Sequence, residues 1–543
     1  MKQFSLGFLI GSIISLPWLS FSYLGYKLFD FPLLPVIFFK WIIERLPGNI
    51  INSSLELMIQ SLNALNIGSL SSSGKFVEFF LAFFLSILGL GSLAGIFNLL
   101  QQPQKPWWIK GGLLGVILWL VSILLILSEK SKISLSVFSW LWLLFISSAW
   151  SLWTTKSVIT ISSLTKDSLD RGRKNAINQL WIGSLALGAL AIGLESLSSI
   201  AKREKELSTL NTTTPQPTED LNQTTLNQFQ SVPGTRPEIT PIKDFFRVDI
   251  NLLPPDQSNI QNNSENLAKV LAAQGGEIES SEEDYLLLID GLVETPLVLD
   301  LATIKTLPAV EQYVTLSCIS NPIGGDLIGT TKFKGVSLKH ILEKVGIRPD
   351  VIEIKFTCAD GYTESLPIES ALNPATILCY SMGDQPLSES HGAPIRLLTP
   401  NRYGMKNPKW IIKIEAIGHN YSGYWEQRGW DKDAWIQPTA VIDTFRKISP
   451  NGIEVGGIAF TGLQGIRSVE IRLDKGKWIP CQVQEPLSLY SWSLWRNSVD
   501  ISPGKHRLYV RVIDKKGEVQ TEERNNTFPK GATGYHSIKI EIK

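Results

Sequence analysis

Cysteine is scarce in this sequence, and its spacing excludes the usual roles of clustered thiols. The 543 residues include four cysteines, with no CxxC pair and no histidine at zinc-ligand spacing. A structural zinc site is therefore not expected. Two disulfides would be possible in an exported protein, but a chain with this much apolar sequence would not need them for stability. We treat the four as separate thiols: Cys318, Cys358, Cys379 and Cys481.

Histidines are also few, and the net charge is close to zero. No histidine precedes His340, so the N-terminal part lacks the imidazole that usually holds haem, and no haem is expected. The same part has no clustered acids within its apolar stretches that would indicate proton transport. A net charge of +1 gives no argument for a nucleic-acid partner, and we expect none. Anchoring is the simplest role for the N-terminal part.

Long apolar stretches are present, all within the first 200 residues. Five come near the length of about 20 residues that spans a bilayer, and tryptophans such as Trp107 and Trp108 stand at their ends. Five buried helices of a soluble protein would fit this pattern poorly. Residues 1–200 are therefore predicted to be a transmembrane region of about five helices in contact with lipid, at 4–26, 76–99, 107–128, 133–153 and 178–197. The shorter stretch 31–43 is expected to be interfacial or re-entrant.

A basic cluster indicates the orientation in the membrane. It precedes the last stretch and is predicted to be cytoplasmic, which places the chain after residue 198 on the periplasmic or extracytoplasmic side of the cell membrane. A cleaved signal peptide is the alternative for the first stretch, although no clear small-residue cleavage site follows it. The cluster also resembles a degenerate twin-arginine signal, but its arginines are not adjacent and a plain anchor explains them too. Its members are Lys166, Arg171, Arg173 and Lys174.

The remaining sequence divides into a linker and two soluble domains. Residues 201–243 are rich in Thr, Gln, Asn and Pro and read as a polar linker. Residues 244–438 mix short β-like runs with one helical segment, "SLKHILEKVG", which predicts an α+β domain. Residues 439–543 alternate strand patterns with turns such as "DKGK" and "DKKG", which predicts an immunoglobulin-like β-sandwich.

Cys318 stands in an unusual stretch, "TLSCISNPIGGDLIGTTKFKGVSL", at residues 315–338. The cysteine ends a β-like run, and Asn321-Pro322 and Gly324-Gly325 follow as a turn and as positions of close backbone approach. A thiolate held at a rigid strand end suits a soft metal or a bulky cofactor. From spacing alone, a small buried core thiol is equally compatible.

The same stretch resembles the signature of the sulfite oxidase family, whose members bind molybdopterin. The resemblance rests on Cys318, Asn321 and "KGVSL", and it continues from about 245 to 438. The C-terminal segment is similar to the family's dimerisation domain through "VEIRLDKGKW" and a tryptophan pair, Trp492 and Trp495. The resemblance implies an α+β molybdopterin-binding domain at 244–438 and a dimerisation-type immunoglobulin-like domain at 439–543. It does not include the membrane part.

The resemblance also implies site residues. Cys318 would be the thiolate ligand to molybdenum, a donor that tunes the potential of a high-valent metal. The block "HGAPIRLLTPNRYGMKNPKW" matches the segment that binds the pterin and its phosphate, and "DFFRVDINLLPP" matches the opening segment of the domain. Cys358 would approach the pterin, although a core thiol is again an alternative, and Cys379 and Cys481 are read as structural. The implied cofactor-binding residues are Phe246, Arg247, Cys318, Cys358, His391, Arg396, Asn407 and Lys409.

Two departures from the family pattern concern the substrate. Sulfite-oxidising members have arginines just after the cysteine, whereas this chain has "NPIGGDLIG" with Asp326. The family's active-site tyrosine is replaced near Trp430, with Tyr424 and Arg428 nearby. A cationic sulfite pocket is therefore not evident in the sequence, although the cofactor is still expected.

Three functions follow from these patterns. The first is a membrane-anchored molybdenum-molybdopterin oxidoreductase that acts on a small molecule by oxygen-atom transfer or another two-electron reaction. Because the sequence has no cytochrome segment, such an enzyme would exchange electrons with a separate carrier. The second is a cofactor-free binding or structural protein with the same fold. The third is a hydrolase that uses Cys318 with His340 or His391 as base. A homodimer through the C-terminal domain is possible in the first case.

Overall fold

The computed structural model forms two compact units, one of residues 1–46 and 76–224 and the other of residues 47–75 and 225–543. The short segment 47–75 thus belongs to the same unit as the two predicted soluble domains, although it precedes most of the apolar stretches. The structure describes residues 2–29, 31–65, 70–100, 106–128, 136–162, 175, 177–186, 229–251, 253–255, 260–261, 269, 277–279 and 285–542.

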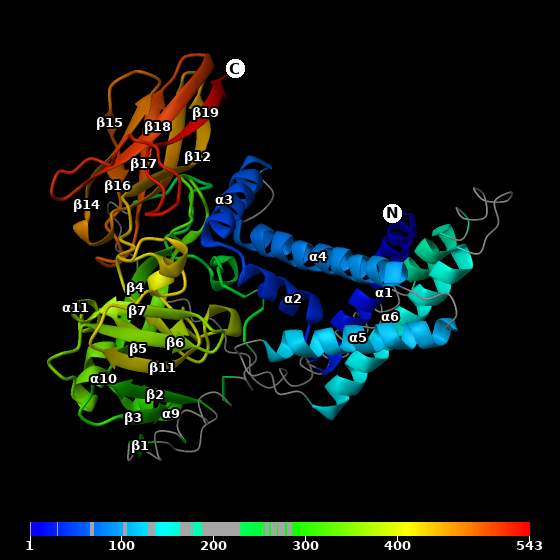
Figure 1. The fold of residues 1–543 in the computed structure, drawn as a ribbon. Helices are drawn as coiled ribbons and strands as arrows, with labels where there is room; N and C mark the ends of the chain where they lie inside the picture. The colour runs from blue at the N-terminus through cyan, green and yellow to red at the C-terminus, as the bar shows by residue number, and fades with distance from the viewer. Residues whose placement is uncertain are drawn as a thin grey trace, which may run out of the picture. The chain divides into compact units, whose positions relative to one another are not determined.

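The first unit is built from long apolar helices (Figure 1). Four described helices are long and apolar enough to cross a membrane, which confirms four of the five predicted spans. The fifth stretch, 178–197, runs into residues 187–197, which lie outside the described residues. The predicted interfacial stretch contains a shorter apolar helix, α2 (Leu34–Ile43). The four long helices are α1 (Lys2–Phe29), α4 (Leu70–Leu100), α5 (Trp107–Leu127) and α6 (Val137–Ser162).

Helices α5 and α6 pack closely at two glycines of α5. A Cβ built on Gly115 would lie 2.7 Å from Ser151 Oγ, and one on Gly111 would lie 2.9 Å from Leu152 Cδ2. Small residues let two helix backbones approach where water is absent. This pairing is the kind of packing that a bundle in a lipid environment requires.

The α+β domain has two sheets that share one core (Figure 1). The first sheet has the order β1-β3-β2-β11-β6-β7, and the second has the order β10-β8-β5-β4 with β9 added to β8. The first contains β1 (Glu277–Glu279), β2 (Leu286–Gly291), β3 (Leu297–Asp300), β6 (Glu353–Cys358), β7 (Thr363–Pro367) and β11 (Ile411–Ile417). The second contains β4 (Ala309–Ser317), β5 (Ile328–Ser337), β8 (Ile377–Met382), β9 (Gln385–Pro386) and β10 (Arg396–Leu398).

The predicted helix of this domain is confirmed as α10 (Leu338–Val345). Its apolar residues recur at helical spacing and enter the core: Leu338, Ile341, Leu342 and Val345 are buried. The helix ends at Gly346, whose φ of +68° favours glycine. The described part of the domain also has two shorter α-helices, α9 (Leu301–Thr306) and α11 (Ile368–Ala371).

The C-terminal domain is the predicted sandwich of two four-stranded sheets. Alternating apolar side chains of both sheets form a core that includes Val455, Val469, Trp495 and Val510, each fully buried. One sheet has β12 (Thr439–Ser449), β13 (Gly452–Phe460), β17 (Ser493–Asp500) and β16 (Gln482–Val483) in that order. The other has β15 (Ile479–Pro480), β14 (Ile466–Leu473), β18 (Gly504–Asp514) and β19 (His536–Ile542).

Segment 47–75 contributes a helix to the second unit, α3 (Gly48–Leu65). Sequence reasoning assigned no element there. Much of the predicted linker, residues 201–228, lies outside the described residues, and the domain boundaries at 243 and 438 stay predictions.

His536, the first residue of β19, gives the fold a pH dependence that can be tested. The backbone N–H of Ile442 donates to its Nδ1 over 3.0 Å. Burial, with the cations Arg236 and Arg524, lowers the pKa of His536 to about 4. The unfolded chain therefore binds a proton near pH 6.5, whereas the folded chain binds it only near pH 4. Stability contributed by neutral His536 is lost as pH falls through this window.

We expect the His536→Gln variant to lose roughly 3 kcal/mol less stability than the wild type between pH 7 and pH 4. Glutamine keeps an acceptor for Ile442 but does not titrate. Thermal unfolding at half-unit pH steps would measure this, with the exposed His419→Gln as the control. Equal pH slopes for His536→Gln and the wild type would contradict the assignment.

Candidate active site

Cys318 lies immediately after β4, in the turn that leads into β5, as the sequence predicted. Its backbone N–H donates to Leu327 O over 2.9 Å, which closes the turn. The Sγ atom lies 3.1 Å from Ser320 Oγ, and the residue is 8% exposed. Burial raises the pKa of the thiol. The sulfur is thus fixed at the end of a rigid strand.

The turn after Cys318 explains its Asn-Pro and Gly-Gly pairs. Asn321 Oδ1 accepts a hydrogen bond from the backbone N–H of Leu327 over 3.0 Å, across the base of the turn. Gly324 has φ +78°, and a Cβ on Gly325 would lie 2.4 Å from Asn321 Oδ1. Asn321 and the glycines therefore hold the backbone that surrounds the sulfur.

Arg396, the first residue of β10, is a buried cation whose hydrogen bonds to described residues go to backbone oxygens. Its Nη1 donates to His391 O over 3.2 Å and its Nη2 to Asn407 O over 3.3 Å. Its Nε is buried and has no hydrogen-bond partner within the part of the chain that the structure describes. Burial lowers the pKa of Arg396 to about 10. A desolvated guanidinium with an orphaned N–H fits a buried anion.

Lys409 and Arg247 meet at one carboxylate, that of Asp249. Both cations form ion pairs with the fully buried Asp249 side chain, and Lys409 Nζ also donates to Ser390 O over 3.2 Å. Burial first, and then the Arg247 charge, hold the pKa of Lys409 well below its usual value. Sequence reasoning missed Asp249, although its place two residues after Arg247 was a possible signal. Asp249 orients both cations.

His391 and Phe246 join the same cluster. Burial and the Arg396 charge lower the pKa of His391 to about 4, so its imidazole is neutral at pH 7. The ring lies edge to face with Phe245, with ring centroids 5.9 Å apart, and Phe245 stacks on Phe246. Arg396 thus contacts His391 and pairs with Lys409 in a β-bridge, whereas Arg247 and Phe246 are linked to them through Asp249 and Phe245.

Asn407 and Cys358 mainly contact the backbone and the core of their own domain. Asn407 Oδ1 accepts from the Thr399 N–H over 2.6 Å, and its Nδ2 donates to Tyr403 O over 3.1 Å, so the amide shapes the segment 401–407. Cys358 is 2% exposed in the core of the first sheet, where burial raises the pKa of its thiol strongly. Direct contacts of either residue with a pterin stay predictions.

The segment 401–407 connects this cluster with Cys318. A Cβ on Gly404 would lie 3.5 Å from the backbone oxygen of Ser317, the residue before the cysteine. Burial, with a smaller contribution from the nearby Cys318 thiol, raises the pKa of Tyr403 to about 12. The predicted metal ligand and the buried Arg396 thus flank one short segment.

The loop of residues 421–435 carries the aromatic and cationic side chains expected near the substrate. The Arg428 guanidinium lies 3.5 Å from the ring centroid of Tyr424, and its Nη1 donates to Tyr424 O over 2.7 Å. Trp430 is 4% exposed and belongs to the same apolar cluster as Ile319, which follows Cys318. The loop therefore shares a core with the cysteine turn.

A buried group of one cation and two carboxylates ties this loop to the segment 401–407. Lys406 is fully buried and lies 2.7 Å from Glu364 Oε1, and it forms a second ion pair with Glu426 in the loop. Burial first, together with the Glu426 charge, raises the pKa of Glu364 to about 7 although Lys406 opposes it. The group was not predicted from the sequence, because nothing local marks these residues as buried.

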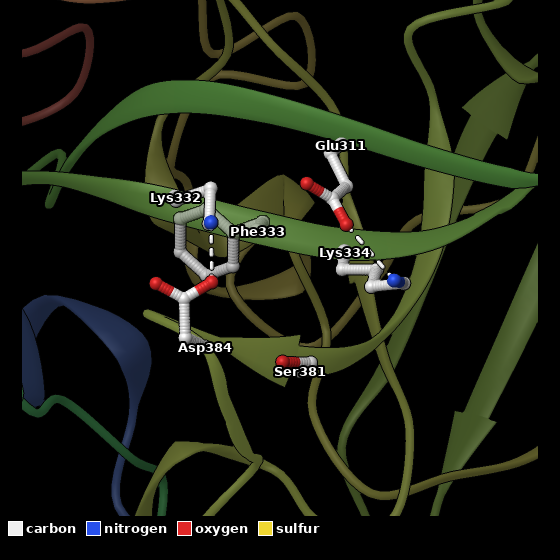
Figure 2. A pocket seen from close by; sticks show the side chains of 6 residues that line it. All are labelled: Glu311, Lys332, Phe333, Lys334, Ser381 and Asp384. Atoms are coloured by element: carbon white, nitrogen blue, oxygen red, sulfur yellow. Dashed lines mark ion pairs between the residues drawn. The ribbon is translucent and has the colours of Figure 1, made fainter. Parts of the chain in front are cut away.

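A surface hollow elsewhere on the domain does not belong to this site (Figure 2). Its charges are already paired, Lys332 with Asp384 and Lys334 with Glu311, the latter over 2.9 Å. None of the predicted site residues lines it; its walls are Glu311, Lys332, Phe333, Lys334, Ser381 and Asp384.

Comparison with known proteins identifies the α+β domain. Residues 275–425 match the family described as "Oxidoreductase molybdopterin binding domain". The chain is 27% identical over 323 residues to the mitochondrial sulfite oxidase of Drosophila melanogaster, covering 48% of this chain and 56% of that protein. It is 25% identical over 328 residues to the sulfite oxidase of Arabidopsis thaliana, covering 48% of this chain and 83% of the relative.

A bacterial relative is more similar over a shorter range. The putative protein-methionine-sulfoxide reductase subunit YedZ1 of Azospira oryzae is 33% identical over 159 residues, covering 29% of this chain and 59% of that protein. Among solved structures, the sulfane dehydrogenase SoxCD of Paracoccus pantotrophus matches with a TM-score of 0.43 and 21% identity, over 49% of this chain and 77% of that one. The chain spans only about half the length of the Drosophila relative (56%). Residues 275–425 thus match a molybdopterin-binding oxidoreductase domain, and the chain is similar to sulfite oxidases over about half of its length.

Proposed function

We propose that this chain is a membrane-anchored molybdenum-molybdopterin oxidoreductase that acts on a small substrate. The observation that carries the proposal is the pairing of two features on either side of the segment 401–407. One is the Cys318 thiol fixed at a strand end, and the other is the buried Arg396 guanidinium together with the half-buried cations Lys409 and Arg247. A soft thiolate suits the metal, and desolvated cations suit a phosphate.

Different residues bind different parts of the cofactor. Cys318 is the protein ligand to molybdenum, and Arg396, Lys409 and Arg247 bind the terminal phosphate of the pterin. Neutral His391 offers a hydrogen bond to the pterin edge, near Phe246, and Asn407 maintains the shape of the segment between the two ends. When bound, the cofactor supplies two-electron and oxygen-atom transfer chemistry, while the protein supplies binding and access.

The substrate and the electron path are further parts of the proposal. Relatives are named for sulfite oxidation and for methionine sulfoxide reduction, so a small molecule that gains or loses one oxygen atom is the substrate class. Arg428 and Trp430, rather than arginines beside Cys318, shape the pocket. Electrons pass to or from a separate carrier, and the catalytic domain lies on the extracytoplasmic side of the membrane. The sandwich serves as a dimerisation surface.

Replacing Cys318 by alanine is expected to abolish molybdenum binding. The full chain, produced in cells that make molybdopterin and purified in detergent, should contain close to one molybdenum per chain, and the Cys318→Ala variant should contain less than a tenth of that. Losing the protein thiolate removes the one side chain assigned to the metal. Metal analysis together with pterin fluorescence measures both parts of the cofactor.

Cys481→Ala is the matched control, because this thiol is half-buried in the sandwich. It should keep wild-type molybdenum. Well-folded wild-type chain without molybdenum or pterin would refute the proposal and favour a cofactor-free binding protein with this fold.

A further inference from the structure

Helix α3 lies against the loop 421–435 through one polar side chain, that of Asn52. Its Nδ2 donates to the backbone oxygen of Arg428 over 2.7 Å, and its Oδ1 accepts from Trp430 Nε1 over 3.2 Å. Asn52 is 6% exposed and Trp430 is 4% exposed. Both ends of the amide are therefore used in a buried contact with two residues of the loop.

The contact is built along one face of the helix. Gly48, Asn52 and Leu55 stand four and three residues apart, which places them on the same side. A Cβ on Gly48 would lie 3.2 Å from Arg428 Cα and 3.3 Å from Arg428 O, so a larger side chain there would fit tightly against the loop. Leu55 packs against the apolar cluster that contains Trp430. Three positions on one face of α3 thus contact the loop 421–435 or the apolar cluster around Trp430.

The loop that α3 contacts is held in turn against the segment 401–407. The backbone N–H of Tyr403 donates to Ala434 O over 2.8 Å, and the Arg402 guanidinium lies 3.8 Å from the ring centroid of Trp435. Lys406 forms an ion pair with Glu426 of the loop. Contacts therefore continue from α3 through the loop to the segment beside Cys318.

We propose that Asn52 is a positioning residue for the oxidoreductase site. It fixes the backbone of Arg428 and the indole of Trp430. Helix α3, although it lies between the apolar stretches in the sequence, therefore helps to hold the substrate loop in place. This inference rests on the proposed function only in taking the loop 421–435 as the substrate loop. Without α3, Trp430 Nε1 and Arg428 O would lose their hydrogen bonds to Asn52.

Hydrogen exchange in the full chain tests the contact without any substrate. Asn52→Leu keeps the volume but loses both hydrogen bonds, and amide exchange in the peptide 424–432 should rise about tenfold, the value for one to two lost bonds. Asn52→Asp keeps an acceptor for the Trp430 indole and should fall between the two. Ser53→Ala, an exposed position on the same helix, should leave exchange unchanged.

Coupling to Trp430 distinguishes positioning from general stability. In a Trp430→Phe background, Asn52→Leu should change exchange less than in the wild type, because one of its two partners is already lost. In molybdenum-loaded protein, Asn52→Leu should raise KM for sulfite, assayed with ferricyanide, or for methionine sulfoxide, assayed with a reduced viologen, several-fold more than it lowers kcat. Molybdenum content should stay at the wild-type level.

Unchanged exchange in the peptide 424–432 of Asn52→Leu would overturn the inference. So would exchange that rises equally across 453–460, a strand of the sandwich, since that pattern indicates global destabilisation. Neither outcome depends on the cofactor, because the exchange experiment works on cofactor-free chain. A wild-type chain without molybdenum would refute the proposed function but not the contact.

Discussion

The Lys406→Met variant should unfold more easily than the wild type by about 3–5 kcal/mol, because it leaves two buried carboxylates without their cation. Lys406 and Glu364 are both fully buried, and Glu426 is nearly so. The Glu364 Oε1 atom also accepts from its neighbour Ser365 N–H, and among the described residues Lys406 is the cation that forms ion pairs with both carboxylates. Urea unfolding of cofactor-free chain in detergent, followed by near-ultraviolet circular dichroism, measures the loss.

The pH dependence of this loss has a definite sign. Burial already raises the pKa of Glu364 to about 7, and removing Lys406 raises it further. A carboxyl with a raised folded pKa destabilises the fold when ionised, so the variant should regain stability as pH falls from 8 to 5. A loss that grows toward low pH would contradict the assignment of charges.

Two matched variants complete the test. Adding Glu364→Gln and Glu426→Gln to Lys406→Met should recover part of the loss, since the buried charges are then removed together. Lys334→Met breaks an exposed pair with Glu311 and should change stability little. If Lys406→Met behaves like Lys334→Met, the buried group does not stabilise the domain.

The sequence was sufficient for features that depend on local pattern. Cys318 was predicted at a strand end because "YVTLSC" alternates like a strand and a turn pair follows, and β4 does end at Ser317. Helix α10 followed from four apolar residues at helical spacing, and the sandwich from hairpin turns between alternating runs. These signals are carried within about ten residues of chain.

Features that depend on distant partners could not be predicted. Asn52 contacts Arg428 across 376 residues of sequence, and nothing around position 52 marks it as buried. Lys406 reads as a surface charge, because lysine is almost never fully buried unless paired, and its partner Glu364 is 42 residues away. For Asp249 the local signal was its place beside Arg247, but its contact with Lys409 spans 160 residues and could not be predicted.

Arg396→Met is expected to release the cofactor roughly 100-fold faster than the wild type, from the loss of about 3 kcal/mol of charge-assisted hydrogen bonding to phosphate. Arg396→Lys keeps the charge but loses the fork, and about tenfold faster release follows. Molybdenum retained on the full chain during dialysis against a chelator gives the rate.

The same substitution separates cofactor binding from folding. In cofactor-free chain the Arg396 cation is desolvated and its Nε has no partner among the described residues, so its removal should lower stability far less than Lys406→Met does. Arg496→Met, which breaks a pair with Glu454 in the sandwich, should leave molybdenum retention unchanged. If Arg396→Met retained molybdenum as long as the wild type, while Cys318→Ala lost it, Arg396 would not be the phosphate ligand. Lys409 and Arg247, joined through Asp249, would then have to bind the phosphate alone.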